Sequence, residues 1–254
     1  MNKLLPLLSF IGLIFSSIAC ADLAGTVSLL KPSVVGIGVY TPTGQPKNKL
    51  YGTGFVIGDG TYIVTNHHVI EQELDDRLLQ KLAVFTGKGR AAKVKLAKLI
   101  AHDEDHDLAI LKIEGQALPA LSLANNDFRR EGSAIAFTGF PIGAVLGLYP
   151  VTHRGIIAAV TPTIIPVDDT RQISIAMLKR LRDPYLVYQL DATAYPGNSG
   201  SAMYDVKTGE VIGIINKVFV QQSKETVISK PSGITYAIPV KYLHQLLKKH
   251  NIKG

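Results

Sequence analysis

The sequence predicts an all-β domain closed by one C-terminal helix. About a dozen short runs rich in β-branched residues follow one another, and Gly, Pro, Asn or Asp interrupts each of them. Apolar residues make up 46% of the 254 residues, which is enough to bury a sizeable core. No helical pattern alternates with these runs, so their spacing favours barrels or a sandwich over βαβ units.

Residues 1–21 have the pattern of a secretory signal peptide. Lys3 lies in a short basic start, Leu4 to Ala19 is an apolar run, and small residues around Cys20 offer a cleavage site. The run is shorter than the roughly 20 apolar residues that a membrane-spanning helix needs. We therefore expect an exported, periplasmic protein, with secretion or lipidation at Cys20 as alternatives and membrane contact only if Cys20 is lipidated. Cleavage removes the one cysteine, which excludes a disulfide and a thiol nucleophile.

The mature chain, 22–254, opens with a short helical stretch from Asp22 to Lys31 and continues in strands. The expected strands are Val34–Tyr40, Tyr51–Ile57, Tyr62–Thr65, Leu82–Phe85, Lys93–Ala101, Leu108–Ile113, Ser133–Gly139, Pro150–Val160, Leu186–Leu190, Val211–Val220 and Gly233–Ile238.

Three segments of the chain do not have the strand pattern: two lie between strands and one follows the last strand. The polar stretch Ala124–Glu131 is the candidate connection between two halves, because it lacks apolar periodicity. Thr161–Pro184 is either a packed surface loop or a border of a substrate groove, with a short amphipathic helix in it. After Pro239 the apolar residues recur at helical spacing, and lysines near Lys249 favour the helix dipole. The sequence therefore predicts a helix over about 239–250.

The charge pattern argues against nucleic acid as a partner. The formal net charge is +7, but the basic residues are spread over several segments without a Lys/Arg block or aromatic-basic alternation. A solvated basic surface, with loose attraction to an anionic envelope, is the simpler interpretation.

Ser199 is the candidate nucleophile. It lies in Gly197-Asn-Ser-Gly-Ser201, where glycines let the backbone turn sharply and bring N–H groups near a reacting carbonyl. A serine hydroxyl needs a neighbouring base. Thr61–Val69 supplies His67 and His68 directly after a strand, and spacing alone does not choose between them.

Asp107 is the candidate orienting carboxylate. It immediately precedes the apolar run Leu108–Ile113, whereas the acidic residues before it lie in a more polar turn. A buried carboxylate behind an imidazole holds the tautomer and orientation that a base needs.

These motifs occur in a fixed order that resembles the protease domain of the HtrA/Deg (high-temperature-requirement) family, within the trypsin-like class. The ordered set is Gly52-Thr-Gly-Phe55, Thr65-Asn-His-His-Val69, Asp107-Leu-Ala-Ile-Leu111, Gly197-Asn-Ser-Gly200 and Gly233-Ile-Thr-Tyr-Ala-Ile-Pro239. The resemblance implies two six-stranded antiparallel β-barrels, about 30–124 and about 131–238, with the site between them. It selects His68 over His67 as the base.

Mechanistically, the resemblance implies a serine endopeptidase that needs no cofactor and takes protein or peptide substrates. His68 accepts the proton of Ser199, Asp107 stabilises the imidazolium, and the segment Gly197, Asn198, Ser199 forms the oxyanion hole through the N–H groups of Gly197 and Ser199.

The chain departs from the family pattern at three points. It stops shortly after Pro239, which leaves no room for the family's usual PDZ domain, while the family's small trimer stays conceivable. Ser201 stands where the family commonly has a glycine, and the same Gly-Asn-Ser-Gly-Ser sequence occurs in glutamyl endopeptidases. Those enzymes use a histidine on the strand after the nucleophile to contact an acidic substrate side chain, and the corresponding strand here has no histidine, so a preference for glutamate is not expected. Thr193 and Val218 predict an uncharged, shallow primary pocket, and Asn216 and Val218 lie where the substrate backbone pairs. We therefore expect cleavage after small aliphatic residues.

Two readings compete with the peptidase. His102 and His106 with Asp103, Asp105 or Asp107 offer metal ligands at close spacing, although we expect no metal. The other reading is a catalytically silent protease fold that acts as an envelope binding or chaperone-like module.

Overall fold

The computed structural model describes residues 22–141, 148–163, 184–216 and 234–254. The predicted leader, Val218, and most of the Thr161–Pro184 segment lie outside these ranges. Among the described residues, no helix has the length and apolar content to cross a membrane.

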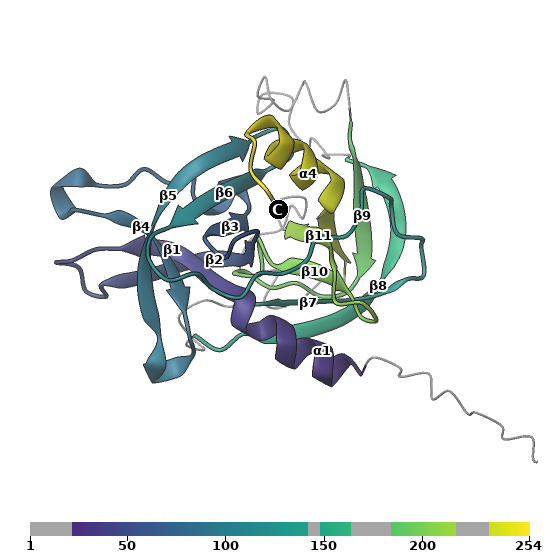
Figure 1. Ribbon diagram of the computed structural model, residues 1–254, viewed down its shortest axis with the longest axis horizontal. Coiled ribbons are helices and arrows are strands. Elements are labelled where there is room, and N and C mark those ends of the chain that lie inside the picture. The colour runs from purple at the N-terminus through teal and green to yellow at the C-terminus, as the bar shows by residue number, and fades with distance from the viewer. Residues whose placement is uncertain (1–21, 142–147, 164–183, 217–233) are drawn as a thin grey trace, which may run out of the picture.

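The first barrel is a closed antiparallel sheet with the strand order β1-β2-β3-β6-β5-β4 (Figure 1). Its strands are β1 (Val34–Tyr40), β2 (Asn48–Ile57), β3 (Tyr62–Thr65), β4 (Lys81–Thr86), β5 (Lys93–Asp103) and β6 (Leu108–Ile113).

The second barrel repeats this arrangement with the order β10-β11-β12-β9-β8-β7. Its strands are β7 (Ala134–Gly139), β8 (Val151–Pro162), β9 (Leu186–Asp191), β10 (Ala202–Asp205), β11 (Val211–Asn216) and β12 (Ile234–Pro239). The predicted fold class is confirmed, but β10 was not among the expected strands.

The apolar runs of several first-barrel strands are nearly continuous because both faces of these strands are buried, each in a different hydrophobic cluster. Val56, Ile63 and Leu111 are buried in a cluster confined to the first barrel. Their neighbours Phe55 and Val64 belong to a second cluster, which includes the core of the second barrel. Because successive side chains point to opposite faces of a strand, both faces of these strands are buried.

Within the described ranges, two α-helices flank the barrels (Figure 1). Helix α1 (Leu23–Leu30) is capped by the Asp22 side chain, which accepts a hydrogen bond from the N–H of Ala24. Helix α4 (Val240–Lys249) buries its apolar stripe, which consists of Val240, Tyr242, Leu243, Leu246 and Leu247, in the cluster shared by the two barrels. It therefore closes the domain as the sequence predicts.

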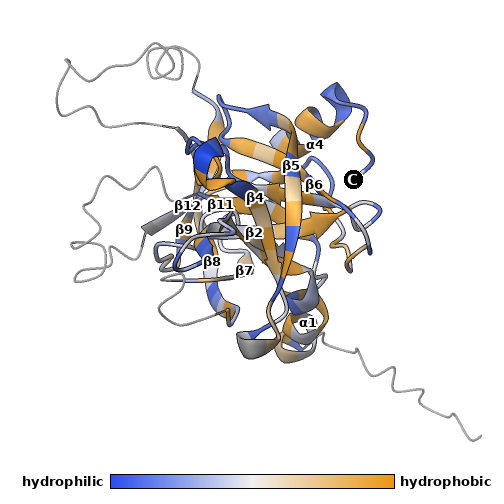
Figure 2. Cartoon of the chain, turned by 90° about the vertical axis from the view of Figure 1, so that its left-hand side faces the viewer, coloured by the Kyte–Doolittle hydropathy of each residue, from blue (hydrophilic) through white to orange (hydrophobic). Residues whose placement is uncertain are grey.

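Strand β5 carries several exposed apolar side chains, and Figure 2 shows orange, hydrophobic segments along this strand. Leu96, Leu99 and Ile100 each remain more than 40% exposed there. Strand β5 nevertheless has a structural role at its C-terminal end, because it pairs with β6 from Ala97 to Asp103 and fixes the turn that leads into Asp107.

Candidate active site

Asp107 lies in the turn between β5 and β6 and fixes the segment that follows β3. Its Oδ1 accepts a hydrogen bond from the backbone N–H of His68 at 2.8 Å, and its Oδ2 lies 2.6 Å from His68 Nδ1. Its backbone carbonyl accepts from His67 N and from the Asn66 side chain. Asp107 thus holds the 3-10 turn His67–Val69 from behind.

This arrangement distinguishes His68 from His67, a choice that the sequence spacing alone did not make. The imidazole of His68 faces the carboxylate through Nδ1, which leaves Nε2 as the other ring nitrogen. His67 instead stacks on His102, with the ring centroids 4.9 Å apart.

The backbone of Asp107 adopts a left-handed conformation, with φ of 53°. Aspartate tolerates this region better than most residues, but the conformation still costs free energy. The three backbone hydrogen bonds around Asp107 and the burial of its side chain, which is 10% exposed, hold it there.

The second barrel contributes a further hydrogen bond to the same carboxylate. Asn216, at the end of β11, is fully buried, and its Nδ2 donates to Asp107 Oδ2 at 2.8 Å. A buried carboxylate is costly unless its oxygens are hydrogen-bonded, and three donors meet this one. From the sequence, Asn216 is expected beside the substrate backbone, and its contact with Asp107 is not predicted. The signal was an asparagine that ends the otherwise apolar run Val211–Ile215.

Removal of this amide gives a measurable prediction. Asn216→Ala is expected to lower kcat about 10- to 100-fold, because a hydrogen bond to a charged group contributes about 1.5–3 kcal/mol. Asn216→Asp should cost more, since it sets a second carboxylate against Asp107. Steady-state kinetics on a peptide amide would measure both. An unchanged kcat in Asn216→Ala would contradict the role.

Ser199 lies in a tight loop between β9 and β10. Asn198 N donates to Tyr195 O and Ser201 N to Asn198 O, each at 3.0 Å, so two turns follow each other. Gly197 and Gly200 have φ of 98° and 85°, which other residues rarely adopt. A Cβ at Gly200 would also collide with the carbonyl oxygen of Thr53.

Thr53 of β2 ties this loop to the first barrel. Its N–H donates to Ser199 O at 2.9 Å, and its hydroxyl donates to Gly197 O at 2.7 Å. The same hydroxyl accepts from Phe140 N, and the carbonyl of Thr53 accepts from Thr65 Oγ1. Thr53 is fully buried, so the Ser199 loop is packed and hydrogen-bonded against the first barrel.

The N–H groups of Gly197 and Ser199 donate to no acceptor within the described ranges, which matches a loop arranged to receive an oxyanion. Asn198 lies between these two residues. Its N–H donates to Tyr195 O and its side chain is fully buried, so Gly197 and Ser199 stay the two predicted oxyanion donors of this segment.

Ser199 itself is 5% exposed. Within the part of the chain that the structure describes, no hydrogen bond joins its hydroxyl to His68. His68 is therefore paired with the Asp107 carboxylate but not with the Ser199 hydroxyl.

His153 of β8 lies beside the nucleophile loop and was not anticipated. Its Nε2 is 3.4 Å from Asn198 Nδ2, and its ring stacks on Phe137 with the centroids 4.9 Å apart. Burial lowers the pKa of His153, because it penalises the charged imidazolium.

The lowered pKa predicts acid-side destabilisation. The unfolded chain binds a proton at His153 near pH 6.5, whereas the folded chain binds it only at lower pH, so stability falls as pH drops through this window. His153→Gln should flatten that slope, measured as urea midpoints at about pH 7.5 and about pH 5.5. The exposed His250→Gln serves as the control. Identical slopes in the wild type and His153→Gln would contradict the prediction.

Of the residues predicted to form the primary specificity pocket, the structure describes Thr193 but not Val218. Thr193 is half-buried between Ala192 and Ala194, and the hydroxyl of Thr235 braces both neighbours by donating to Ala192 O and accepting from Ala194 N. Val218 lies outside the described residues. The predicted uncharged floor and shallow wall therefore stay predictions.

The acidic turn does not form the metal cluster considered from the sequence. His106 Nδ1 pairs with Asp103 Oδ2 at 2.7 Å, and its ring packs on Tyr242 with the centroids 4.2 Å apart. Asp107 faces His68 instead. These side chains therefore do not converge on one point with His102.

The fold and this site define the class of the protein. The family model described as a trypsin-like peptidase domain matches residues 52–214, and the chain belongs to that family.

Within the family, the chain is similar to HtrA-type proteases, as the motifs predict. It is 32% identical over 190 residues to a probable periplasmic serine endoprotease DegP-like of Halomonas elongata, covering 74% of this chain and 32% of the relative. It is 30% identical to the protein of the same name in Chlamydia trachomatis, covering 77% and 32%. The chain spans about a third of the length of these curated relatives.

Solved structures agree. A crystal structure of Deg5 superposes with a TM-score of 0.61 at 26% identity, covering 87% of this chain and 90% of that one. The HtrA-type protease AlgW with a tripeptide gives a TM-score of 0.64 at 26% identity, covering 90% and 63%.

Proposed function

We propose that this chain is an exported serine endopeptidase in which Ser199 attacks the peptide carbonyl, His68 is the general base and Asp107 orients it. The observation that carries the proposal is the 2.6 Å contact of His68 Nδ1 with Asp107 Oδ2. A carboxylate that accepts from Nδ1–H favours the tautomer in which Nε2 can accept a proton. Family membership and the nearby loop with two unengaged N–H groups support it.

In the proposed reaction, His68 Nε2 takes the proton of Ser199 as the hydroxyl adds to the scissile carbonyl. The imidazolium then gives a proton to the leaving amine, and water repeats the sequence on the acyl-enzyme. The N–H groups of Gly197 and Ser199 hold the developing oxyanion; loss of one such donor typically costs about 3 kcal/mol. Asp107 stays ionised and stabilises the imidazolium.

A fluorophosphonate probe tests the proposal, because it labels only an activated serine. The wild-type protein is expected to label, and Ser199→Ala is expected not to label. Ser28→Ala, an exposed serine on α1, is the matched control and should label like the wild type. Folded wild-type protein that never labels, with an unfolded protein substrate present or absent, would overturn the proposal.

One observation favours a second candidate, a silent protease fold that binds unfolded proteins. Ser199 is nearly buried, and its hydroxyl is not bonded to His68 in the part of the chain described. Binding of a reduced, unfolded protein without turnover, unchanged in Ser199→Ala, would select this candidate.

For specificity we propose Val, Ala or Ile at the cleavage site. Thr193 brings no charge to the pocket region, and one methylene-sized misfit changes discrimination by about 1–3 kcal/mol. A peptide library should therefore show kcat/KM at least about tenfold higher after Val than after Phe. Equal cleavage after both would contradict the proposed pocket.

We propose the periplasm as the location, because the curated relatives are named periplasmic and residues 1–21 read as a leader. A small assembly and lipidation at Cys20 stay predictions from the sequence.

A further inference from the structure

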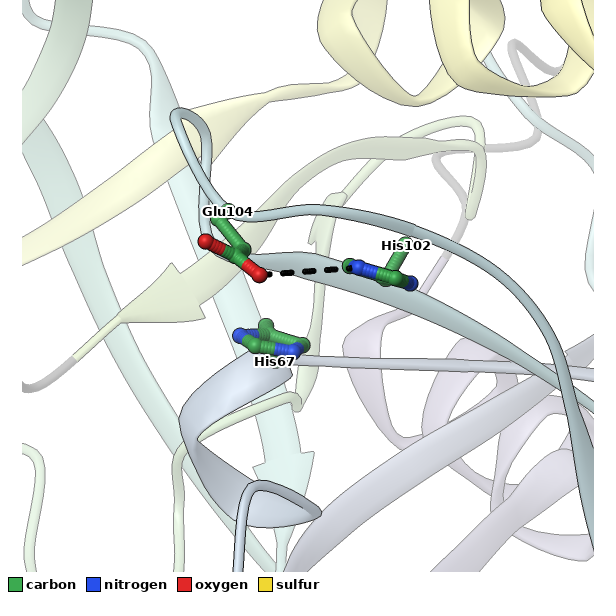
Figure 3. Close-up of side chains that lie close together, drawn as sticks. All are labelled: His67, His102 and Glu104. Carbon is green, nitrogen blue, oxygen red and sulfur yellow. Dashed lines mark ion pairs between the residues drawn. The ribbon is translucent and has the colours of Figure 1, made fainter. Parts of the chain in front are cut away.

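Three side chains with metal-binding atoms meet beside the proposed base (Figure 3). His67 lies in the turn after β3, His102 lies near the end of β5, and Glu104 lies in the turn that follows β5. Strands β3 and β5 both pair with β6, so the barrel brings their ends together although they are far apart in sequence.

The geometry is close to that of a bound ion. His102 Nε2 lies 3.6 Å from Glu104 Oε1, and the potential ligand atoms of the three residues lie within 4.8 Å of one another. Ligand bonds of about 2.0–2.2 Å at tetrahedral angles place neighbouring ligand atoms about 3.4 Å apart. Side-chain rotation alone can close the difference, because the side chains of His102 and Glu104 are 45% and 68% exposed.

The two imidazole rings already lie next to each other. The rings of His67 and His102 are stacked, with centroids 4.9 Å apart and an inclination of 15°. An imidazole nitrogen binds a metal ion in the plane of its own ring, so at least one of the two rings must rotate before both can bind one ion. The partial exposure of the His102 side chain leaves room for that rotation.

We propose that His67, His102 and Glu104 form a binding site for Zn²⁺, with a fourth position left to solvent. Two imidazoles and one carboxylate are a donor set that zinc accepts, whereas calcium and magnesium prefer oxygen ligands alone. The proposal departs from the expectation that the protein holds no metal, and it replaces the cluster around His106.

Two of the three ligands are bonded to Asp107 through the backbone. His67 N donates to Asp107 O at 3.2 Å, and Asp107 N donates to Glu104 O at 3.3 Å. A bound ion would therefore brace the turn that carries His68 against the turn that carries Asp107. The expected consequence is a more stable first barrel at the edge of the active site.

The test measures binding and stability in Ser199→Ala, so it does not depend on peptidase activity. The full chain, without a polyhistidine tag, is stripped with a chelator and titrated with Zn²⁺ by calorimetry. One equivalent of zinc is expected to bind and to raise the melting temperature by several degrees. Co²⁺ should give the visible absorption of a tetrahedral site, and Ca²⁺ should not bind.

Substitutions in the same Ser199→Ala background locate the site. His102→Gln and Glu104→Gln remove exposed ligands and should each weaken zinc binding at least about tenfold without loss of fold. His250→Gln, an exposed histidine near the end of α4, is the matched control and should bind like its parent. Absent binding, equal affinity for Ca²⁺, or an affinity unchanged in His102→Gln would overturn the proposal.

Discussion

An alanine in place of His68 is expected to lower kcat for peptide hydrolysis by about a million-fold. The substitution removes the only imidazole that faces Asp107 in the described part of the chain. With it goes the proposed acceptor of the Ser199 proton. The backbone N–H of residue 68 still donates to Asp107 Oδ1, so the turn retains one of its two bonds to the carboxylate. Initial rates with a peptide amide, beside circular dichroism of the same sample, would measure the effect.

The matched control is His67→Ala, which removes the adjacent histidine but leaves the proposed base in place. In protein stripped of metal, so that the proposed zinc site does not contribute, it is expected to retain most of the activity, because the His67 ring stacks on His102 and does not face Asp107. The assignment of the base would be wrong if His67→Ala abolished turnover and His68→Ala did not.

Asp107→Asn is expected to lower kcat by about 10⁴-fold with little change of fold. Three donors converge on the two carboxylate oxygens, namely His68 N, His68 Nδ1 and Asn216 Nδ2. A carboxamide has one acceptor oxygen, so either orientation sets its NH₂ against a donor or forces His68 into the tautomer that cannot accept at Nε2. Asparagine also tolerates the left-handed backbone of this position.

The kinetics would separate this effect from unfolding. The loss should appear in kcat with KM nearly unchanged, because Asp107 acts through His68 and is not expected to touch the substrate. Asp127→Asn, an exposed aspartate between the barrels, is the control and should be silent. A loss confined to KM would argue against the orienting role.

Most strands of the fold could be predicted from the sequence because runs of β-branched residues bounded by turn residues recur along the chain. Val34–Tyr40, Tyr62–Thr65 and Leu108–Ile113 begin and end where the alternation and turn residues predict. Strand β10 was missed because its four residues follow Ser201 without a breaker, so only pairing with β7 and β11 defines it. Closure into two barrels was an inference from the family resemblance and not from any single run.

Residues of the candidate site could be predicted from the sequence only where they lie in recognisable local motifs. Ser199 and Asp107 stand at turns beside apolar strands, which the sequence displays. Asn216 and His153 approach the site from β11 and β8, and such contacts depend on barrel register, which periodicity does not give. The meeting of His67 with His102 has the same origin, because it depends on the neighbours of β6.

Thr53 gives the nucleophile loop its dependence on the other half of the molecule. Thr53, a residue of the first barrel, donates hydrogen bonds to the backbone carbonyls of Gly197 and Ser199, on both sides of Asn198. The conformation of the Ser199 loop therefore depends on contacts that the second barrel does not itself supply. The reactive state is therefore a joint property of the two barrels. A displacement of one barrel against the other would therefore act on the Ser199 loop through the hydrogen bonds of Thr53.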